Sequence, residues 1–192
     1  GTFIRSFMQR NSGLVGEILY VEDSKTAATV TIKMLEKQGL KVTHVTNAEE
    51  GLTILIANEH EGENDFDLVI TDFYLMGKMT GGDLLHAIRA KLHHSQQELP
   101  VLVLTSTDDE KTQVEVFHAG ANDYVTKPLV EQVMIARVRA LLLIKHQYNA
   151  LKLQAESMSC IAAPDSLNGV HSRRYLRDNG EWYLRQPSHK LL

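Results

Sequence analysis

The feature that most constrains this fold is an alternation of short apolar segments with helix-like segments, repeated five times along the chain. The apolar segments have the length of strands and cover residues 17–21, 41–45, 68–72, 100–105 and 123–126. Between them, apolar residues recur at helical spacing, as they do from Ala27 to Leu35. Short strands that alternate with helices predict an α/β fold, in which helices cover both faces of a parallel sheet.

Capping residues predict where the helices begin and end. The first helix is expected from Ser24 to Gln38, ended by Gly39. The later helices are expected to begin at Asn47, after Gly81 and Gly82, at Asp108 or Asp109, and at Pro128. Residues 59–65 are predicted to form a polar loop, and His93–His94 a solvated helix end.

The amino-acid composition argues against several classes of protein. Of the 192 residues, 43% are hydrophobic and 23% are charged, and the formal net charge is −4, so we expect no basic face for nucleic acid. No apolar run approaches the ~20 residues that span a bilayer. Arginines occupy the N-terminal segment where a signal peptide would be apolar. Cys160 is the only cysteine, which excludes an internal disulfide and fits a reducing cytoplasm. We also expect no membrane partner.

Polar side chains follow four of the five predicted strands. Ligands of open parallel sheets bind at the carboxyl ends of the strands, so these side chains are candidates for one site. They are Glu22 and Asp23, Asp72, Thr105 and Ser106, and Lys127 with Pro128.

This set of side chains suggests phosphoryl transfer. Three carboxylates at one edge repel each other, and Mg²⁺ would resolve this because it prefers hard oxygen ligands. Lys127 could neutralise phosphoryl oxygens and Thr105 could donate to one, while a carboxylate itself can accept the phosphoryl group. Singly, each residue has an ordinary structural explanation: an aspartate as a helix cap, Thr105 as a strand residue, Lys127 as a surface charge. Their joint occurrence at the strand ends favours a site.

Four segments resemble the receiver domain of two-component response regulators. They are ILYVEDS (18–24), LVITDFYL (68–75), VLVLTS (101–106) and GANDYVTKP (120–128). The resemblance covers about residues 16–145 and implies a flavodoxin-like, doubly wound sheet of five parallel strands in the order 2-1-3-4-5. An extended C-terminal helix is expected to follow it.

The resemblance also implies roles for individual residues. Asp72 would be the phosphoacceptor, with Thr105 and Lys127 contacting the phosphoryl group and Tyr124 as the switch aromatic. Glu22, Asp23, Asp72 and the backbone carbonyl of Tyr74 would hold Mg²⁺. The Lys127–Pro128 bond is expected to be cis, as it often is in this family.

The implied partner is a histidine kinase or a phosphotransfer protein, and the chain itself would not be an enzyme. A homodimer is expected either through the face of the fourth helix and fifth strand or through the C-terminal helix.

Two alternative functions stay open: an Mg²⁺-dependent hydrolase with an aspartate nucleophile, and a docking receiver that is not phosphorylated. Tyr74 argues against the hydrolase, since those enzymes usually place a second aspartate two residues after the nucleophile. One departure from the receiver pattern is Met76, where receivers usually have proline.

The C-terminal part suggests a connection to an output domain. Apolar residues continue at heptad spacing through Leu141, Ile144, Tyr148, Leu151, Ala155, Met158 and Ala162. DSLNGVHSRRYL (165–176) resembles the opening segment of GGDEF-type diguanylate cyclase domains, but the chain lacks their Gly-Gly-Asp-Glu-Phe motif. We therefore expect an N-terminal segment (1–15), a receiver (16–145), a helical stalk (146–163) and the truncated start of an output domain or a disordered tail (164–192).

Overall fold

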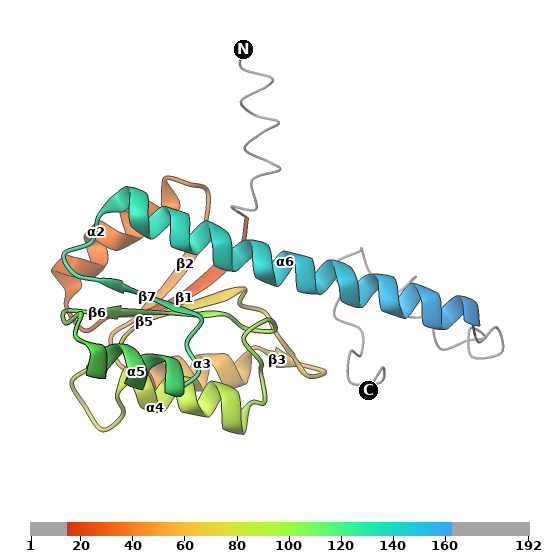
Figure 1. Cartoon of the computed structure of the whole chain (residues 1–192), viewed down its shortest axis with the longest axis horizontal. Coiled ribbons are helices and arrows are strands. Elements are labelled where there is room, and N and C mark those ends of the chain that lie inside the picture. The colour runs from red at the N-terminus through yellow and green to blue at the C-terminus, as the bar shows by residue number, and fades with distance from the viewer. Residues whose placement is uncertain (1–14, 163–192) are drawn as a thin grey trace, which may run out of the picture.

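The computed structural model describes residues 15–162 as a three-layer α/β domain with one long helix leading away from it (Figure 1). The main sheet contains β1 (Glu17–Val21), β2 (Lys41–Val45), β5 (Leu68–Asp72), β6 (Val101–Thr105) and β7 (Asp123–Thr126). The helices are α2 (Lys25–Glu36), α3 (Ala48–Ala57), α4 (Gly81–His86), the π-helix η1 (Ala87–Lys91), α5 (Glu110–His118) and α6 (Glu131–Ala162). The segment that resembles a cyclase opening lies outside the described residues.

All neighbouring strands of the main sheet are parallel, and their order is β2-β1-β5-β6-β7. Counted along the predicted strands, this is the expected order 2-1-3-4-5. The order reverses direction at β1, so the carboxyl ends of β1 and β5 flank the point where such sheets bind their ligands.

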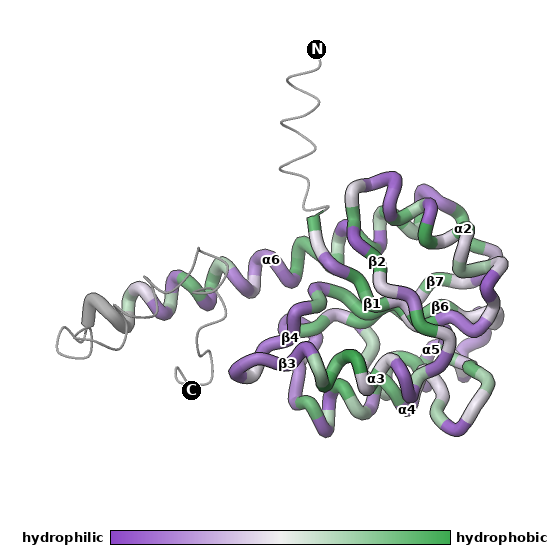
Figure 2. Tube along the Cα trace, turned by 180° about the vertical axis from the view of Figure 1, so that it is seen from behind, coloured by the Kyte–Doolittle hydropathy of each residue, from purple (hydrophilic) through white to green (hydrophobic). Residues whose placement is uncertain are grey.

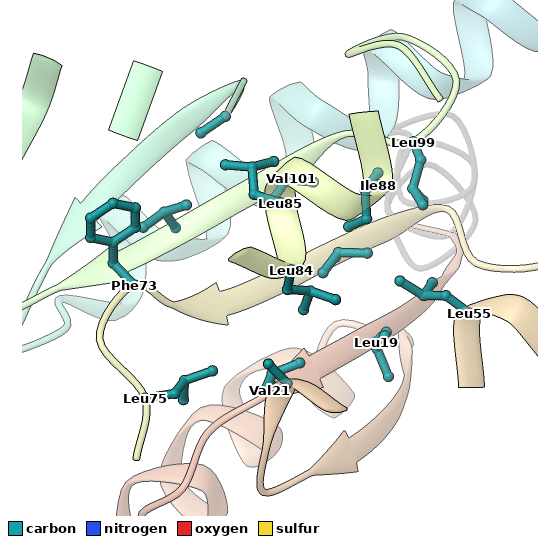
Figure 3. Packing of buried hydrophobic residues seen from close by; sticks show 14 of the residues in the cluster. Leu19, Val21, Leu55, Phe73, Leu75, Leu84, Leu85, Ile88, Leu99 and Val101 are labelled. Carbon is teal, nitrogen blue, oxygen red and sulfur yellow. The ribbon is translucent and has the colours of Figure 1, made fainter. Parts of the chain in front are cut away.

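Alternating residues of each strand fill two separate cores, one on each face of the sheet. Leu19 and Val21 of β1 pack in the core beneath α3 and α4, which Figure 3 shows with Leu55 and Leu84. Ile18 and Tyr20 point the other way, into the core beneath α2 and α6. Complete burial of such side chains is worth about 1.5–3 kcal/mol each, which holds both helix layers on the sheet.

Three of the predicted helix starts are confirmed by side-chain caps. Ser24, Asn47 and Asp109 each accept a hydrogen bond from the backbone N–H three residues ahead, at 3.2, 2.8 and 2.7 Å. The prediction for the third helix is wrong in detail. Gly81 and Gly82 are its first two residues, and the cap is Thr80, which forms a reciprocal capping box with Asp83.

Residues 59–65, predicted as a polar loop, instead form a short antiparallel hairpin of β3 (Glu59–His60) and β4 (Glu63–Asn64). Both turn residues, Glu61 and Gly62, have positive φ values of 53° and 86°, as two-residue hairpin turns require. The Asn64 amide donates to the Leu55 carbonyl at 2.8 Å and so fixes the hairpin to α3. Strands of two residues are too short to give a periodic sequence pattern.

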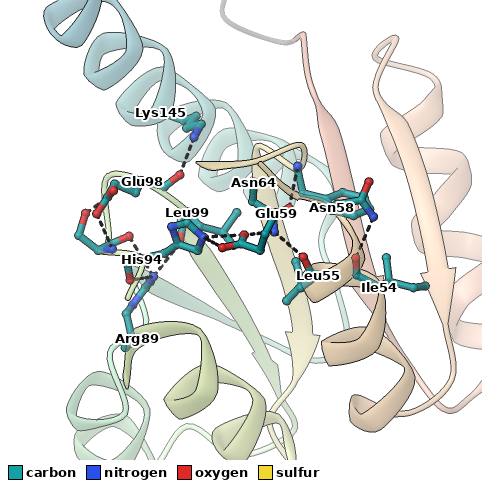
Figure 4. A network of polar contacts seen from close by, with 12 residues as sticks. Ile54, Leu55, Asn58, Glu59, Asn64, Arg89, His94, Glu98, Leu99 and Lys145 are labelled. Atoms are coloured by element: carbon teal, nitrogen blue, oxygen red, sulfur yellow. Dashed lines mark hydrogen bonds and ion pairs between the residues drawn. The ribbon is translucent and has the colours of Figure 1, made fainter. Parts of the chain in front are cut away.

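The prediction of a solvated His93–His94 pair is wrong for His94, which is 2% exposed. Its Nε2 lies 2.7 and 2.8 Å from the two carboxylate oxygens of Glu59 on the hairpin (Figure 4). Close by, the Arg89 guanidinium donates to the carbonyls of His94, Ser95 and Leu99. These contacts fix the segment that follows η1 against the helix itself.

Helix α6 begins at Glu131, three residues later than the helix start predicted at Pro128, and runs unbroken to Ala162. The Lys127–Pro128 peptide bond before it is cis, as expected. The first half of α6 lies on the sheet, and the second half extends beyond it (Figures 1 and 2). In that second half Leu151 and Met158 are 65% and 63% exposed.

Two lysines of α6 face the body of the domain. Lys145 donates to the Glu98 carbonyl at 2.6 Å, and Lys152 forms an ion pair with Glu63 of the hairpin. The extended helix is thereby connected to the domain beyond the apolar core. Within residues 15–162, no helix has both the length and the apolar character needed to cross a membrane.

Candidate functional site

Three carboxylates meet at the carboxyl edge of the sheet, as the sequence predicted. Glu22 and Asp23 directly follow β1, and Asp72 is the last residue of β5. One oxygen from each lies within 4.8 Å of the others. Glu22 and Asp72 are almost fully buried, at 1% and 6% exposure, while Asp23 is half-buried. Acids this close and this buried need a cation to be stable when ionised.

In this structure the cation is the ammonium of Lys127. Its Nζ donates to Glu22 Oε1 at 2.9 Å and lies 2.8 and 2.9 Å from the two oxygens of Asp72. The Lys127 backbone N–H donates to the Thr105 carbonyl at 2.8 Å, which extends the ladder of β6 and β7 and fixes the start of the side chain.

The three groups have opposing pKa shifts. Burial, together with the neighbouring Glu22 carboxyl, raises the pKa of Asp72 to about 7. Burial acts in the same direction on Glu22, but its contacts with Asp72 and Lys127 outweigh burial and lower its pKa. For Lys127, burial is outweighed by the hydrogen bonds to Asp72 and Glu22, and the pKa is raised. Asp72 is therefore the carboxyl that holds a proton most readily.

Sequence reasoning missed the groups that position Glu22. Its Oε2 accepts the Ser24 backbone N–H at 3.2 Å, and its Oε1 lies 3.5 Å from the hydroxyl of the buried Tyr20. The His44 ring donates from Nε2 to the Glu22 carbonyl at 2.9 Å. Tyr20 was assigned only to an apolar strand, and no sequence pattern distinguishes a tyrosine that serves a site from one that fills a core.

The loop after Asp72, where the sequence departs from the receiver pattern, is held by acids from other elements. Asp23 Oδ2 accepts the Met76 backbone N–H at 3.1 Å, and Glu49 Oε1 accepts that of Met79 at 2.7 Å. The Met76 side chain is 79% exposed, and Gly77 has a φ of 119°, which favours glycine.

Gly81 fixes where this loop ends. A Cβ atom there would lie 1.8 Å from the Asp72 carbonyl oxygen, so only glycine fits. The Gly81 backbone N–H also donates to the Phe73 carbonyl at 2.9 Å. The start of α4 therefore packs directly on the backbone of the candidate acceptor.

The side chain of Tyr74 is 57% exposed, and its ring lies edge-on to Phe73 with centroids 5.0 Å apart. Thr105 is 3% exposed at the end of β6, one residue after Leu104, which pairs with Asp72 of β5 in the sheet. Tyr124 on β7 is half-buried, and its hydroxyl donates to Asp108 at 2.9 Å. The structure thus brings Glu22, Asp23, Asp72 and Lys127 into one cluster, and it places Thr105 and Tyr124 on the adjoining strands.

This arrangement suits a hard divalent cation and a phosphoryl group. Carboxylate oxygens are the ligands that Mg²⁺ prefers, and the half-buried Asp23 leaves the cluster open to solvent on one side. Asp72 could act as nucleophile, because its oxygens are held in place by Lys127 at the end of a rigid strand.

The family profile of the response regulator receiver domain matches residues 18–139. The chain belongs to the receiver family. The match covers the main sheet except for Glu17, the first residue of β1, and it ends within α6. Family membership decides between the receiver and hydrolase hypotheses in favour of the receiver.

Curated relatives of this receiver include transcriptional regulators. The chain is 36% identical over 127 residues to the transcriptional regulatory protein YkoG of Bacillus subtilis (strain 168), covering 66% of this chain and 51% of that protein. It is 34% identical over 125 residues to the cell cycle transcriptional regulator CtrA of Caulobacter vibrioides (strain NA1000 / CB15N), covering 64% and 48%. The chain spans about half the length of these relatives.

Solved structures agree with the fold. The receiver domain of a signal transduction histidine kinase from Syntrophus aciditrophicus is 34% identical, with a TM-score of 0.56, and covers 66% of this chain and 89% of that one. A two-component system response regulator/GGDEF domain protein is 26% identical, with a TM-score of 0.62, and covers 72% of this chain and 53% of that one. The flavodoxin-like receiver fold predicted from the sequence is confirmed.

Proposed function

We propose that this receiver accepts a phosphoryl group on Asp72 from the phosphohistidine of a histidine kinase or a phosphotransfer protein. The observation that carries the proposal is the cluster at the sheet edge, where Glu22, Asp23 and Asp72 lie within 4.8 Å of one another and Lys127 contacts two of them. An intact cluster of this kind also favours a phosphorylated receiver over one used only for docking.

The reaction needs little from the protein besides positioning and charge. A carboxylate oxygen of Asp72 attacks the phosphorus atom and forms an acyl phosphate. The bond from phosphorus to the histidine nitrogen breaks, and its electron pair returns to the imidazole ring. Lys127 moves from the carboxylates to the incoming phosphoryl oxygens, and the Thr105 hydroxyl donates to one of them.

Glu22, Asp23, Asp72 and the Tyr74 carbonyl would hold Mg²⁺, which supplies positive charge to the phosphoryl oxygens when it is bound. Because a bound cation favours ionised carboxylates, Asp72 would lose the proton that its raised pKa otherwise allows it to keep.

Phosphorylation would be reported through Thr105 and Tyr124 to the face formed by α5 and β7.

The division into receiver, stalk and output start is likewise part of this proposal. In it α6 crosses from receiver to stalk without interruption, and pairing of two copies through α6 or through the α5–β7 face controls an output domain. A diguanylate cyclase is one candidate output. The curated relatives are named as transcriptional regulators. For the residues of this chain itself we propose no nucleic-acid partner. Such a receiver would act in the cytoplasm, where its kinase donors present phosphohistidine.

Phosphorylation can be tested with a small donor and intact-protein mass spectrometry. The parent chain, incubated with phosphoramidate and Mg²⁺, should gain one phosphoryl group that is labile to acid, base and hydroxylamine, as an acyl phosphate is, and EDTA should abolish the gain. Asp72→Asn should gain none, whereas the control Asp83→Asn, which alters an exposed acid in the cap of α4, should behave like the parent. Stoichiometric phosphate on Asp72→Asn would contradict the assignment.

A further inference from the structure

The loop between β6 and α5, residues 106–109, is bonded to both proposed switch residues. The Thr105 hydroxyl accepts the Thr107 backbone N–H and donates to the Thr107 carbonyl, both at 3.2 Å. It also lies 3.3 Å from the Thr107 hydroxyl. Within the described part of the chain, every hydrogen bond of the Thr105 hydroxyl therefore goes to Thr107.

Thr107 in turn connects Thr105 to helix α5. Its hydroxyl donates to the Thr112 hydroxyl at 3.1 Å, and Thr112 is 6% exposed in the first turn of that helix. The Thr112 backbone N–H donates to the capping carboxylate of Asp109 at 2.7 Å. A continuous series of hydroxyl contacts thus runs from the edge of the sheet to the start of α5.

Asp108, the next residue of the loop, holds the second switch residue. The Tyr124 hydroxyl donates to Asp108 Oδ1 at 2.9 Å, and the Gln113 amide donates to the same oxygen at 2.9 Å. The Tyr124 ring lies edge-on to Phe117 of α5, with centroids 5.8 Å apart. Partial burial and the Asp108 carboxylate together raise the pKa of Tyr124.

We infer that Thr107 and Asp108 form a latch that holds the receiver in its resting conformation. The inference rests on the proposed function, because it concerns how that site is regulated. A hydroxyl has one proton, so Thr105 cannot donate to a phosphoryl oxygen while it donates to Thr107. Tyr124 cannot turn inward while its hydroxyl is bonded to Asp108. Both contacts break on switching, so Thr107 and Asp108 are positioning residues that set the ratio of switched to resting protein.

A matched pair of variants tests the Thr107 contact in the full chain. Thr107→Val keeps the shape and loses the hydroxyl that fixes Thr107 to Thr112 and contacts the Thr105 hydroxyl, whereas Thr107→Ser keeps that hydroxyl. The two backbone bonds between Thr105 and Thr107 are present in both variants but are no longer held in place by the side chain in Thr107→Val. In the unphosphorylated protein, Thr107→Val should raise the ratio of switched to resting form about two- to tenfold, the worth of one hydrogen bond. The raised ratio would appear as amide NMR shifts partway to those of the phosphorylated parent, and as faster phosphorylation by phosphoramidate. Thr107→Ser should match the parent. Identical behaviour of the two variants would overturn the inference.

A double-mutant cycle tests the Asp108 contact. Asp108→Ala and Tyr124→Phe both remove the hydrogen bond between Tyr124 and Asp108, and Asp108→Ala also removes the one from Gln113. The double variant should therefore shift the ratio no further than Asp108→Ala alone. Glu110→Ala changes an exposed acid of the same region and should leave the ratio unchanged. Additive effects of the two substitutions would overturn this half of the latch.

Hydrogen exchange separates failure of the latch from failure of the proposed function. In the unphosphorylated chain, Thr107→Val should speed amide exchange in the first turn of α5 about two- to tenfold relative to Thr107→Ser. This measurement needs no phosphoryl group, so it decides the latch even if the parent is never phosphorylated. A parent phosphorylated on Asp72 with equal exchange in both variants would refute the latch alone.

Discussion

At the residue scale, the site balances two buried carboxyls against one ammonium. Asp72 and Glu22 both contact Lys127, yet burial and Glu22 raise the pKa of Asp72 while the pKa of Glu22 is lowered. The protein therefore keeps its candidate nucleophile as the more weakly acidic of the two groups. A divalent cation would reverse this preference and ionise Asp72, so in the proposed reaction metal binding and nucleophile activation would be coupled through one carboxyl.

The raised pKa of Asp72 predicts a pH dependence of stability in metal-free protein. A carboxyl whose pKa rises from 3.8 to about 7 on folding stabilises the fold when protonated, so its contribution is full below about pH 4 and is lost by about pH 7. Measured in EDTA by urea denaturation, the free energy of unfolding of the parent relative to Asp72→Asn should fall on the order of 2 kcal/mol across this range, allowing for the opposite shift of Glu22. A difference that stays constant with pH would contradict the assignment.

Asp23 offers a cleaner test of repulsion within the cluster than Glu22, which also binds Lys127 and the Ser24 backbone. Asp23→Asn keeps an acceptor for the Met76 N–H and removes one negative charge. We expect Mg²⁺ affinity to fall at least tenfold by calorimetry, while the metal-free protein becomes about 0.5–1 kcal/mol more stable to urea. Lower stability of the metal-free variant would show that the hydrogen bond outweighs the repulsion.

At the scale of elements, the strands and the caps were predictable and the contacts between distant segments were not. The runs LVITD and VLVLT are buried at every residue, and such runs have few alternatives to a central strand. Asn47 and Asp109 cap helices because a short polar side chain can reach the N–H three residues ahead. His94 was mispredicted because its partner, Glu59, comes from a hairpin far away in sequence. The carboxylates of the site were predictable because strand ends meet at one edge. Glu49, in contrast, reaches the loop after Asp72 from α3, and the Tyr20 hydroxyl lies near Glu22 within a side chain that the sequence pattern assigns to the core.

The contact between α4 and β5 predicts different effects for two adjacent glycines. Gly81→Ala places a Cβ atom against the Asp72 backbone and should lower the free energy of unfolding by about 2–4 kcal/mol. Gly82→Ala meets only the edge of the Phe73 ring, at 3.2 Å, and gains helix propensity worth up to about 1 kcal/mol. Urea denaturation of both variants checks this, and equal losses would show that α4 can move away from Asp72.

At the scale of the whole molecule, α6 belongs to two environments. Its first half completes a core through Met134, Val138 and Leu142, which are fully buried. Its second half carries Leu151 and Met158 in the open, seven residues apart and in register with Ile144. Seven-residue spacing is the repeat of a two-stranded coiled coil, so this exposed stripe supports the proposed pairing of two copies through α6.

Pairing through the exposed stripe of Leu151 and Met158 can be tested by placing negative charges on it. Leu151→Glu with Met158→Glu should convert a dimer of the full chain to a monomer in sedimentation experiments on phosphorylated protein, because like charges at the seam repel. Gln154→Glu with Ser157→Glu adds the same charge on other exposed positions and should leave the dimer intact. Loss of the dimer in both variants would indicate a general charge effect, and persistence in both would assign pairing to the α5–β7 face.

The ion pair between Lys152 and Glu63 gives the long helix a second support. Two residues of α6, Val138 in the core and Lys152 at its contact with the hairpin, are separated by ~21 Å along the helix axis, at 1.5 Å per residue. A rigid helix held at two points this far apart tilts by only ~3° when one of the two contacts shifts by ~1 Å. The β3–β4 hairpin thus acts as a strut, and it sets the angle at which the receiver presents its helix to whatever the helix joins.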